Sequence, residues 1–236
     1  MKAVDQPGDP ASTNALPAGN FSDWLRAMRK ALGGDEGMQV ACGECVGCCT
    51  SSYFIKVRAH ETQALRRIDA RQLSPAPAAA PGDVLMGFDE RGHCPMFGAG
   101  GCTIYQHRPE TCRTYDCRVF TATGMNAGDG KSVINERVAR WRFEYPTQRD
   151  REEHAAVIAA ASFIRQHPVK FPDGHVPARP AEIAVLAVKA YQVFLDRPGS
   201  HRHVADAIVA ACQTFDQQAA KPATSGRTYE KHRPRP

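Results

Sequence analysis

The sequence predicts an α+β fold: a small cysteine-rich unit of short strands and helices, followed by a mainly helical C-terminal section, with disordered termini. Two observations predict this division. Eight of the nine cysteines lie between residues 42 and 117, in a stretch interrupted by Gly and Pro. After residue 140, apolar residues recur at helical spacing in three successive segments. With 236 residues the chain is long enough to bury a substantial core.

Composition and charge suggest four segments. Residues 1–20 are rich in Pro, Gly, Ala and Asn and are expected to be disordered. A cysteine-cluster domain is expected over 21–120 and the helical section over 121–216, before a basic disordered tail at 217–236. The formal charge is +5, and residues 221–236 contribute most of it. A short basic tail is usually a solvated end, so we do not expect nucleic-acid binding.

The first structured element expected is an amphipathic helix over residues 21–32. Its apolar residues Trp24, Leu25 and Met28 fall on one face. Ser22 is the expected N-cap, and the Gly pair that begins at Gly33 is expected to end the helix.

The cysteine-rich part contains three further predicted elements. Residues 52–57 are aromatic and β-branched and predict a strand. Apolar spacing predicts a helix over 60–73, and a short strand is expected over 84–88. Between them, the proline-rich stretch 74–82 is expected to be a surface connection.

The sequence pattern of the second half of the chain predicts one strand and three helices. Charged and aromatic residues alternate over 140–145, which indicates a half-buried strand. Helices are expected over 149–166, 180–195 and 201–215, and Cys212 on the last is expected to be a buried core thiol. The residues expected to face inward on the first helix are Ala155, Ile158, Ala159 and Phe163.

A dense cysteine run provides the main functional signal. Cys42, Cys45 and Cys48 recur every third residue on a Gly-containing loop, and Cys49 follows directly. Thiolates at this spacing can converge on one metal centre. The first twenty residues lack an apolar segment, and nowhere do about 18 apolar residues run together. We therefore expect a cytoplasmic protein without a membrane span, where reduced thiols favour metal binding over disulfides.

A second cysteine group follows at Cys94, Cys102, Cys112 and Cys117. Eight thiolates make two sets of four, and four thiolates suit either Zn(II) or an iron–sulfur cluster. The three-residue spacing of the first run, with a remote Cys that precedes Pro95, is typical of bacterial ferredoxins. This spacing favours an iron–sulfur cluster, while zinc stays open as the alternative.

These residues resemble a known family, the YkgJ-type CxxCxxCC cysteine-cluster proteins. The matching features are the run that begins at Cys42, Cys94 before Pro95, the segment CTIYQHRPETCR that begins at Cys102, and Cys117. The resemblance covers residues 42–118 and implies a zinc- or iron-chelating domain. Some members of the family carry this module in flagellin lysine methylases.

Three other residues of the motif are candidates for contact with the cofactor. Arg108 and Arg113 lie beside cysteines in sequence and could pair with an anionic thiolate centre. Tyr105 is expected to pack in the core close to the centre, with its hydroxyl hydrogen-bonded.

These features favour a metal-binding protein with a structural or electron-transfer role. Its partners would be metal ions and a protein that the sequence does not identify. Two alternatives stay open: a cluster-dependent modifying or redox enzyme, like the flagellin methylases, and a metal carrier.

Overall fold

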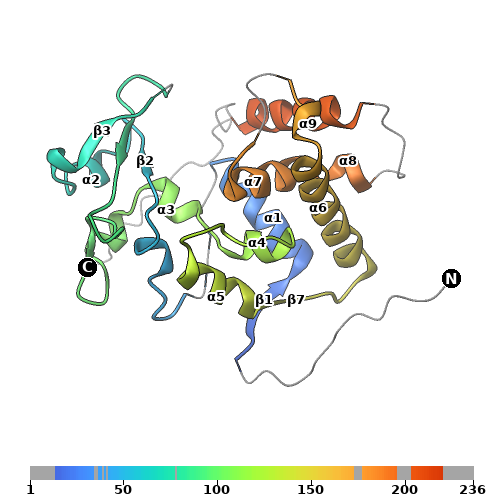
Figure 1. The fold of residues 1–236 in the computed structure, drawn as a ribbon, viewed down its shortest axis with the longest axis horizontal. Helices are drawn as coiled ribbons and strands as arrows, with labels where there is room; N and C mark the ends of the chain where they lie inside the picture. The colour runs from blue at the N-terminus through green and yellow to red at the C-terminus, as the bar shows by residue number, and fades with distance from the viewer. Residues whose placement is uncertain are drawn as a thin grey trace, which may run out of the picture.

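The computed structural model describes residues 14–34, 37–38, 40, 42–77, 79–172, 177–195 and 203–219. The predicted α+β class is confirmed, because short strands combine with helices and the C-terminal part is helical. Figure 1 shows the small strands β2 and β3 at one side of the molecule and helices α6 to α9 at the other. Most of the two segments expected to be disordered, 1–20 and 217–236, lies outside the described residues.

The first two elements of the described chain are a strand and a helix. Strand β1 (Leu16–Asn20) runs parallel to β7 (Trp141–Glu144). The expectation of disorder is therefore wrong for β1, whose partner lies more than a hundred residues away in sequence. Helix α1 (Phe21–Leu32) has the predicted bounds and ends at Gly33. Its N-cap is Asn20, two residues before the predicted Ser22.

The cysteine-rich part contains a small antiparallel sheet with strand order β2-β4-β3. Its buried apolar residues are few: Ile55, Val57, Ala64, Ile68, Met86 and Ile104. The bounds are β2 Ile55–Val57, β3 Leu73–Pro75 and β4 Val84–Met86, with helix α2 at Thr62–Leu65. A hairpin of β5 (Phe97–Gly98) and β6 (Gly101–Cys102) follows.

The predicted helix over 60–73 is wrong after Leu65. A 3₁₀ turn (Ala70–Gln72) and strand β3 take its place. The Asp69 carboxylate accepts a hydrogen bond from the Arg71 backbone N–H at 2.9 Å, which starts the turn. Leu73 then pairs with Met86, so a strand forms where the predicted connection 74–82 was expected to begin.

Three short helices connect the small sheet to the helical section. They are α3 (Glu110–Thr114), α4 (Arg118–Ala122) and α5 (Ser132–Arg140). Strand β7 follows α5 directly, close to the predicted bounds 140–145.

The helical section consists of α6 (Gln148–Gln166), α7 (Pro180–Ala190), α8 (Gln192–Leu195) and α9 (Val204–Ala219). The predicted helix over 180–195 is interrupted at Tyr191, and His201 of the third predicted helix lies outside the described residues. The predicted inward face of α6 is wrong, since Ala155 and Ile158 are exposed. Helix α6 instead buries Ala156, Val157 and Ala160, because α1 and α7 contact it from two sides.

Two connected cores hold this part of the molecule. The larger core joins α1, α4, α5, β7, α6 and α7 around Phe21, Phe120 and Trp141. The other lies between α6, α7 and α9, where Cys212 is buried as predicted. Among the described residues, none of the helices has the length and apolar character needed to cross a membrane.

Candidate metal centre

The first cysteine run forms a tight turn that packs closely against α5. The Cys45 N–H donates to the Cys42 carbonyl at 3.0 Å, and a 3₁₀ turn (Gly47–Cys49) follows. Gly43 has φ +55°, a conformation that favours glycine. A Cβ at Gly47 would lie 3.2 Å from Ile134 Cγ1, so a larger residue would push the loop away from α5.

A backbone hydrogen bond joins the two cysteine stretches. The Cys94 N–H donates to the Cys49 carbonyl at 2.7 Å. Cys102 ends β6, Cys112 lies within α3, and Cys117 immediately precedes α4. The short elements between residues 94 and 117 therefore place the second cysteine group beside the first run.

Five cysteines line one small cavity of about 90 Å³. They come from both stretches: Cys42, Cys45, Cys48, Cys112 and Cys117. Burial raises the pKa of Cys117 to about 11, and the nearby Cys42 and Cys45 thiols contribute to this rise. The two stretches are thus adjacent in the fold, as the sequence interpretation requires.

The other three cysteines gather next to this cavity. A hydrogen bond with Cys48 raises the pKa of the Cys49 thiol, and Cys94 and Cys102 contribute to the same rise. The bond from Cys49 in turn lowers the pKa of Cys48 below its usual value. Burial raises the pKa of Cys112 to about 12, with Cys48, Cys94 and Cys102 as further causes. Adjacent Cys48 and Cys49 therefore link two neighbouring groups of thiols.

All nine cysteines are free thiols, so no disulfide competes for these sulfurs. In the parts of the chain that the structure describes, no three His, Cys, Asp or Glu side chains are already arranged to hold one metal ion. The donor set nevertheless fits zinc or iron in kind and number, because eight soft sulfur ligands lie within two adjoining groups. Metal binding would require the thiol side chains to reorient on this backbone.

Arg108, Arg113 and Tyr105 also line the cavity. The Arg108 guanidinium lies over the Tyr105 ring, 3.9 Å from its centroid, and its Nε is buried without a hydrogen-bond partner among the described residues. Arg113 Nη2 lies 3.7 Å from Glu61 Oε1. The expectation that Tyr105 packs in the core is wrong, because its side chain is 57 % exposed and serves as a platform for Arg108.

In the structure, two further residues that the sequence did not indicate lie next to the cysteines. The Trp141 indole N–H donates to Cys117 Sγ at 3.3 Å. Arg137 lines the cavity and lies over the Trp141 ring at 5.0 Å. Both follow the motif by about twenty residues, and neither residue type is itself a metal ligand, so no spacing rule would have identified them.

Asp116 anchors the cluster to the rest of the fold. Its carboxylate is 1 % exposed and accepts hydrogen bonds from the Trp24 indole at 2.8 Å and from Arg118. The Arg118 guanidinium also donates to the Ala18 carbonyl at 3.0 Å. Asp116 therefore ties Cys117 to α1 and β1.

Thiols from two distant stretches, gathered on short elements, define a cysteine-cluster domain. Residues 41–136 match the CxxCxxCC family model, described as a putative zinc- or iron-chelating domain. The predicted resemblance is confirmed and extends beyond residue 118 to include part of α5. Comparisons with curated proteins and with solved structures give no match.

Proposed function

We propose that this protein binds an iron–sulfur cluster through its cysteine groups, in a structural or electron-transfer role. The observation that carries the proposal is the cavity lined by five cysteines from both stretches. The proposed ligands are the eight cysteines between residues 42 and 117. Proximity favours one group of Cys42, Cys45, Cys48 and Cys117 and a second group of Cys49, Cys94, Cys102 and Cys112.

Iron–sulfur chemistry is favoured over zinc by ligand spacing, and the surroundings of the sulfurs are compatible with it. The first run has ferredoxin-like spacing, and Cys94 precedes a proline. The Trp141 N–H already points at Cys117 Sγ, and hydrogen bonds to sulfur tune cluster potentials. A bound cluster would supply one-electron chemistry, while the chain supplies the ligands and their charge environment.

Arg108 is the residue best placed to compensate the negative charge of ionised thiols. Its charge favours the thiolate forms of Cys48 and Cys112, and Tyr105 holds the guanidinium beside them. The unpartnered Nε supplies a free donor in this region. We assign Arg113 a secondary role, because Glu61 already lies near its guanidinium.

Anaerobic purification with metal and sulfide analysis distinguishes the two chemistries. A cluster predicts brown protein with iron and acid-labile sulfide in equal amounts and with absorption in the visible range. Colourless protein with stoichiometric zinc and no sulfide would indicate that the site holds mononuclear zinc and not a cluster. Protein without either metal after anaerobic reconstitution would contradict both forms of the proposal.

A second pocket supports the enzyme alternative. It has a volume of about 330 Å³ and shares Arg108 and Arg113 with the cysteine cavity. His60, Glu61 and His107 also line it. Convergent polar groups beside a redox centre are what a cluster-dependent enzyme would require. Replacing His60 and His107 by Asn should then abolish turnover of a substrate and leave the cluster spectrum unchanged.

The carrier alternative depends on exposed ligands. Cys42 and Cys48 are exposed, so solvent and another protein can reach them. A carrier would transfer radiolabelled metal to an apo acceptor protein within minutes. Retention of the label over hours would support the structural or electron-transfer role.

A further inference from the structure

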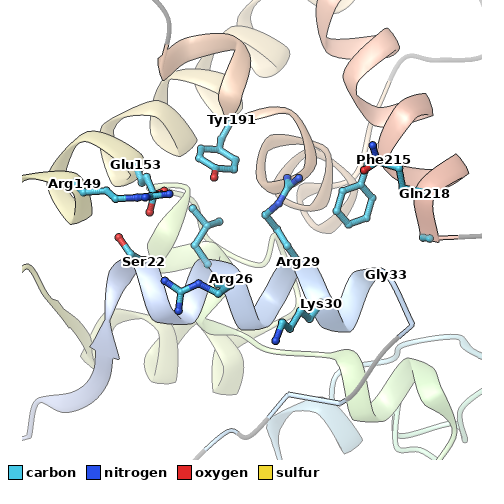
Figure 2. A pocket seen from close by; sticks show the side chains of 12 residues that line it. Ser22, Arg26, Arg29, Lys30, Gly33, Arg149, Glu153, Tyr191, Phe215 and Gln218 are labelled. Atoms are coloured by element: carbon cyan, nitrogen blue, oxygen red, sulfur yellow. The ribbon is translucent and has the colours of Figure 1, made fainter. Parts of the chain in front are cut away.

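A larger cavity lies away from the cysteines. Its volume is about 510 Å³, within the range of small-molecule sites, roughly 300–1,000 Å³. Helix α1 forms its floor, and residues of α6, the α7–α8 junction and α9 complete it (Figure 2). No cysteine lines it, so it is separate from the candidate metal centre.

Arg29 is the central cation of this cavity. Figure 2 shows its side chain rising from α1 between Tyr191 and Phe215. Its Nη1 donates to the carbonyls of Val188 and Lys189, both at 2.8 Å. The guanidinium lies 5.3 Å from the Tyr191 ring centroid and 4.8 Å from that of Phe215. These contacts orient Arg29 but bring no negative charge to it.

Burial disfavours the Arg29 charge more than nearby groups, among them Glu153, compensate it. Desolvation lowers the pKa of Arg29, which shows that the surroundings disfavour its charged form. Among the described residues, no carboxylate forms an ion pair with it. Two contacts at Nη1 leave the Nε and Nη2 donors available, and a guanidinium can present such donors to an anion as a fork.

Other cations line the same cavity. Arg26, Lys30 and Arg149 carry three further positive charges, but Arg26 Nη1 pairs with Asp23 Oδ1 at 2.8 Å. Glu153 Oε1 is already paired with Arg149 Nε at 2.9 Å. The Lys30 side chain forms no ion pair or hydrogen bond within the part of the chain that the structure describes. Among the described residues, Arg29 and Lys30 are thus the lining cations outside an ion pair, and a dianion matches these two charges better than a monoanion.

Apolar surface completes the cavity. Leu25 and the rings of Tyr191 and Phe215 line it beside the cations. We propose that this cavity binds a small phosphorylated molecule, with the phosphate facing the Arg29 guanidinium and the apolar part against Leu25 and Phe215. Lys30, whose side chain lies on the outer side of α1, contributes its charge at the rim of the cavity (Figure 2). Arg and Lys together suit phosphate, because Arg supplies directed donors and Lys a compact charge.

Calorimetric titration with phenyl phosphate tests this proposal, with benzoate as a monoanion that carries the same ring. We expect saturable one-to-one binding of phenyl phosphate and at least tenfold weaker binding of benzoate. Lys30→Glu should weaken phenyl phosphate binding at least tenfold. Arg66→Glu makes the same charge change on an exposed side chain of the cysteine-rich part and should leave binding unchanged. Arg29→Lys keeps the charge but removes the fork, and should also weaken binding.

Three outcomes of these titrations would overturn the proposal. They are no saturable binding of phenyl phosphate, equal binding of benzoate, or an equal loss in Arg66→Glu and Lys30→Glu. Because no cysteine lines the cavity, metal-stripped protein should bind phenyl phosphate as tightly as loaded protein. Loss of binding on stripping would assign the phosphate to the metal and overturn the proposal. If Arg29→Lys fails to fold, Lys30→Glu on the exposed side of α1 still decides the question.

Discussion

The cysteine-rich part and the helical part of this molecule differ in how their folded structures are stabilised. The helical part has long elements, such as α6 (Gln148–Gln166), whose buried faces join two connected cores. The small sheet has strands of three residues, and among the described residues its core contains six buried apolar side chains. Cys94, Cys102 and Cys112 pack at the edge of that small core.

The difference indicates what each part depends on. Apolar burial stabilises the helical part without help, because each buried large side chain contributes about 1.5–3 kcal/mol. Few such side chains are available to the cysteine-rich part, and small domains of this kind are usually completed by metal. We therefore expect the proposed metal centre to have a structural role even if it also transfers electrons.

Removal of the metal should produce the largest difference in stability between the cysteine-rich part and the helical part. A strong chelator is expected to unfold the cysteine-rich part, because structural metal binding supplies on the order of 10 kcal/mol. Hydrogen exchange followed by mass spectrometry should show loss of protection in β2 and β4. Protection in α6 and α7 should remain. Unchanged protection of β2 after complete metal removal would contradict the structural role.

Asp116→Ala should uncouple the two parts. The substitution removes a buried carboxylate from Trp24 and Arg118, which costs about 3–5 kcal/mol of unfolding free energy. Chemical denaturation of loaded protein measures the change. Asp23→Ala is the control, since Asp23 pairs with Arg26 at the surface and should cost about 1 kcal/mol or less. Equal effects would show that Asp116 does not connect the two parts.

Trp141→Phe should alter the metal centre more than the fold. It removes the N–H that reaches Cys117 Sγ, and loss of such a partner weakens metal binding roughly tenfold. Competition with a chelator measures the affinity. Trp24→Phe also removes an indole donor, but that donor reaches Asp116 and no cysteine. Metal affinity lowered equally by both variants would mean that the hydrogen bond to sulfur has no special role.

The smallest expected effect concerns acid stability of the helical part. Hydrogen bonds from the Thr147 side chain and the Ser22 backbone N–H hold the pKa of Asp150 well below its usual range. A carboxyl with a lowered pKa stabilises the fold fully above its unfolded pKa, about 4, and this contribution is lost as pH falls. Asp150→Asn should therefore flatten the decline in unfolding free energy below about pH 4. An identical decline in both proteins would exclude Asp150 as its source.

The sequence predicted the elements whose pattern is local. Helix α1 was predicted with its observed bounds, because one apolar face and Gly33 define it. The inward face of α6 could not be predicted from spacing, because Ala lies on several sides and neighbouring helices cover two of them. Strand β1 depends on its pairing with β7, which no local pattern reveals.

The candidate site was predictable only in part for the same reason. The cysteines were identified by spacing, and the structure brings their two stretches together through the Cys94–Cys49 backbone bond. Trp141 and Arg137 reach the cluster because α5 packs against the first run at Gly47. That contact is tertiary, so it left no signal in the motif.

X-ray absorption at the metal edge of the purified protein tests the central claim most directly. Thiolate ligation predicts sulfur as the only first neighbour, at about 2.3 Å from the metal. With a cluster, a second metal neighbour should also be visible. A first neighbour set made of oxygen or nitrogen would contradict the claim that these cysteines hold the metal.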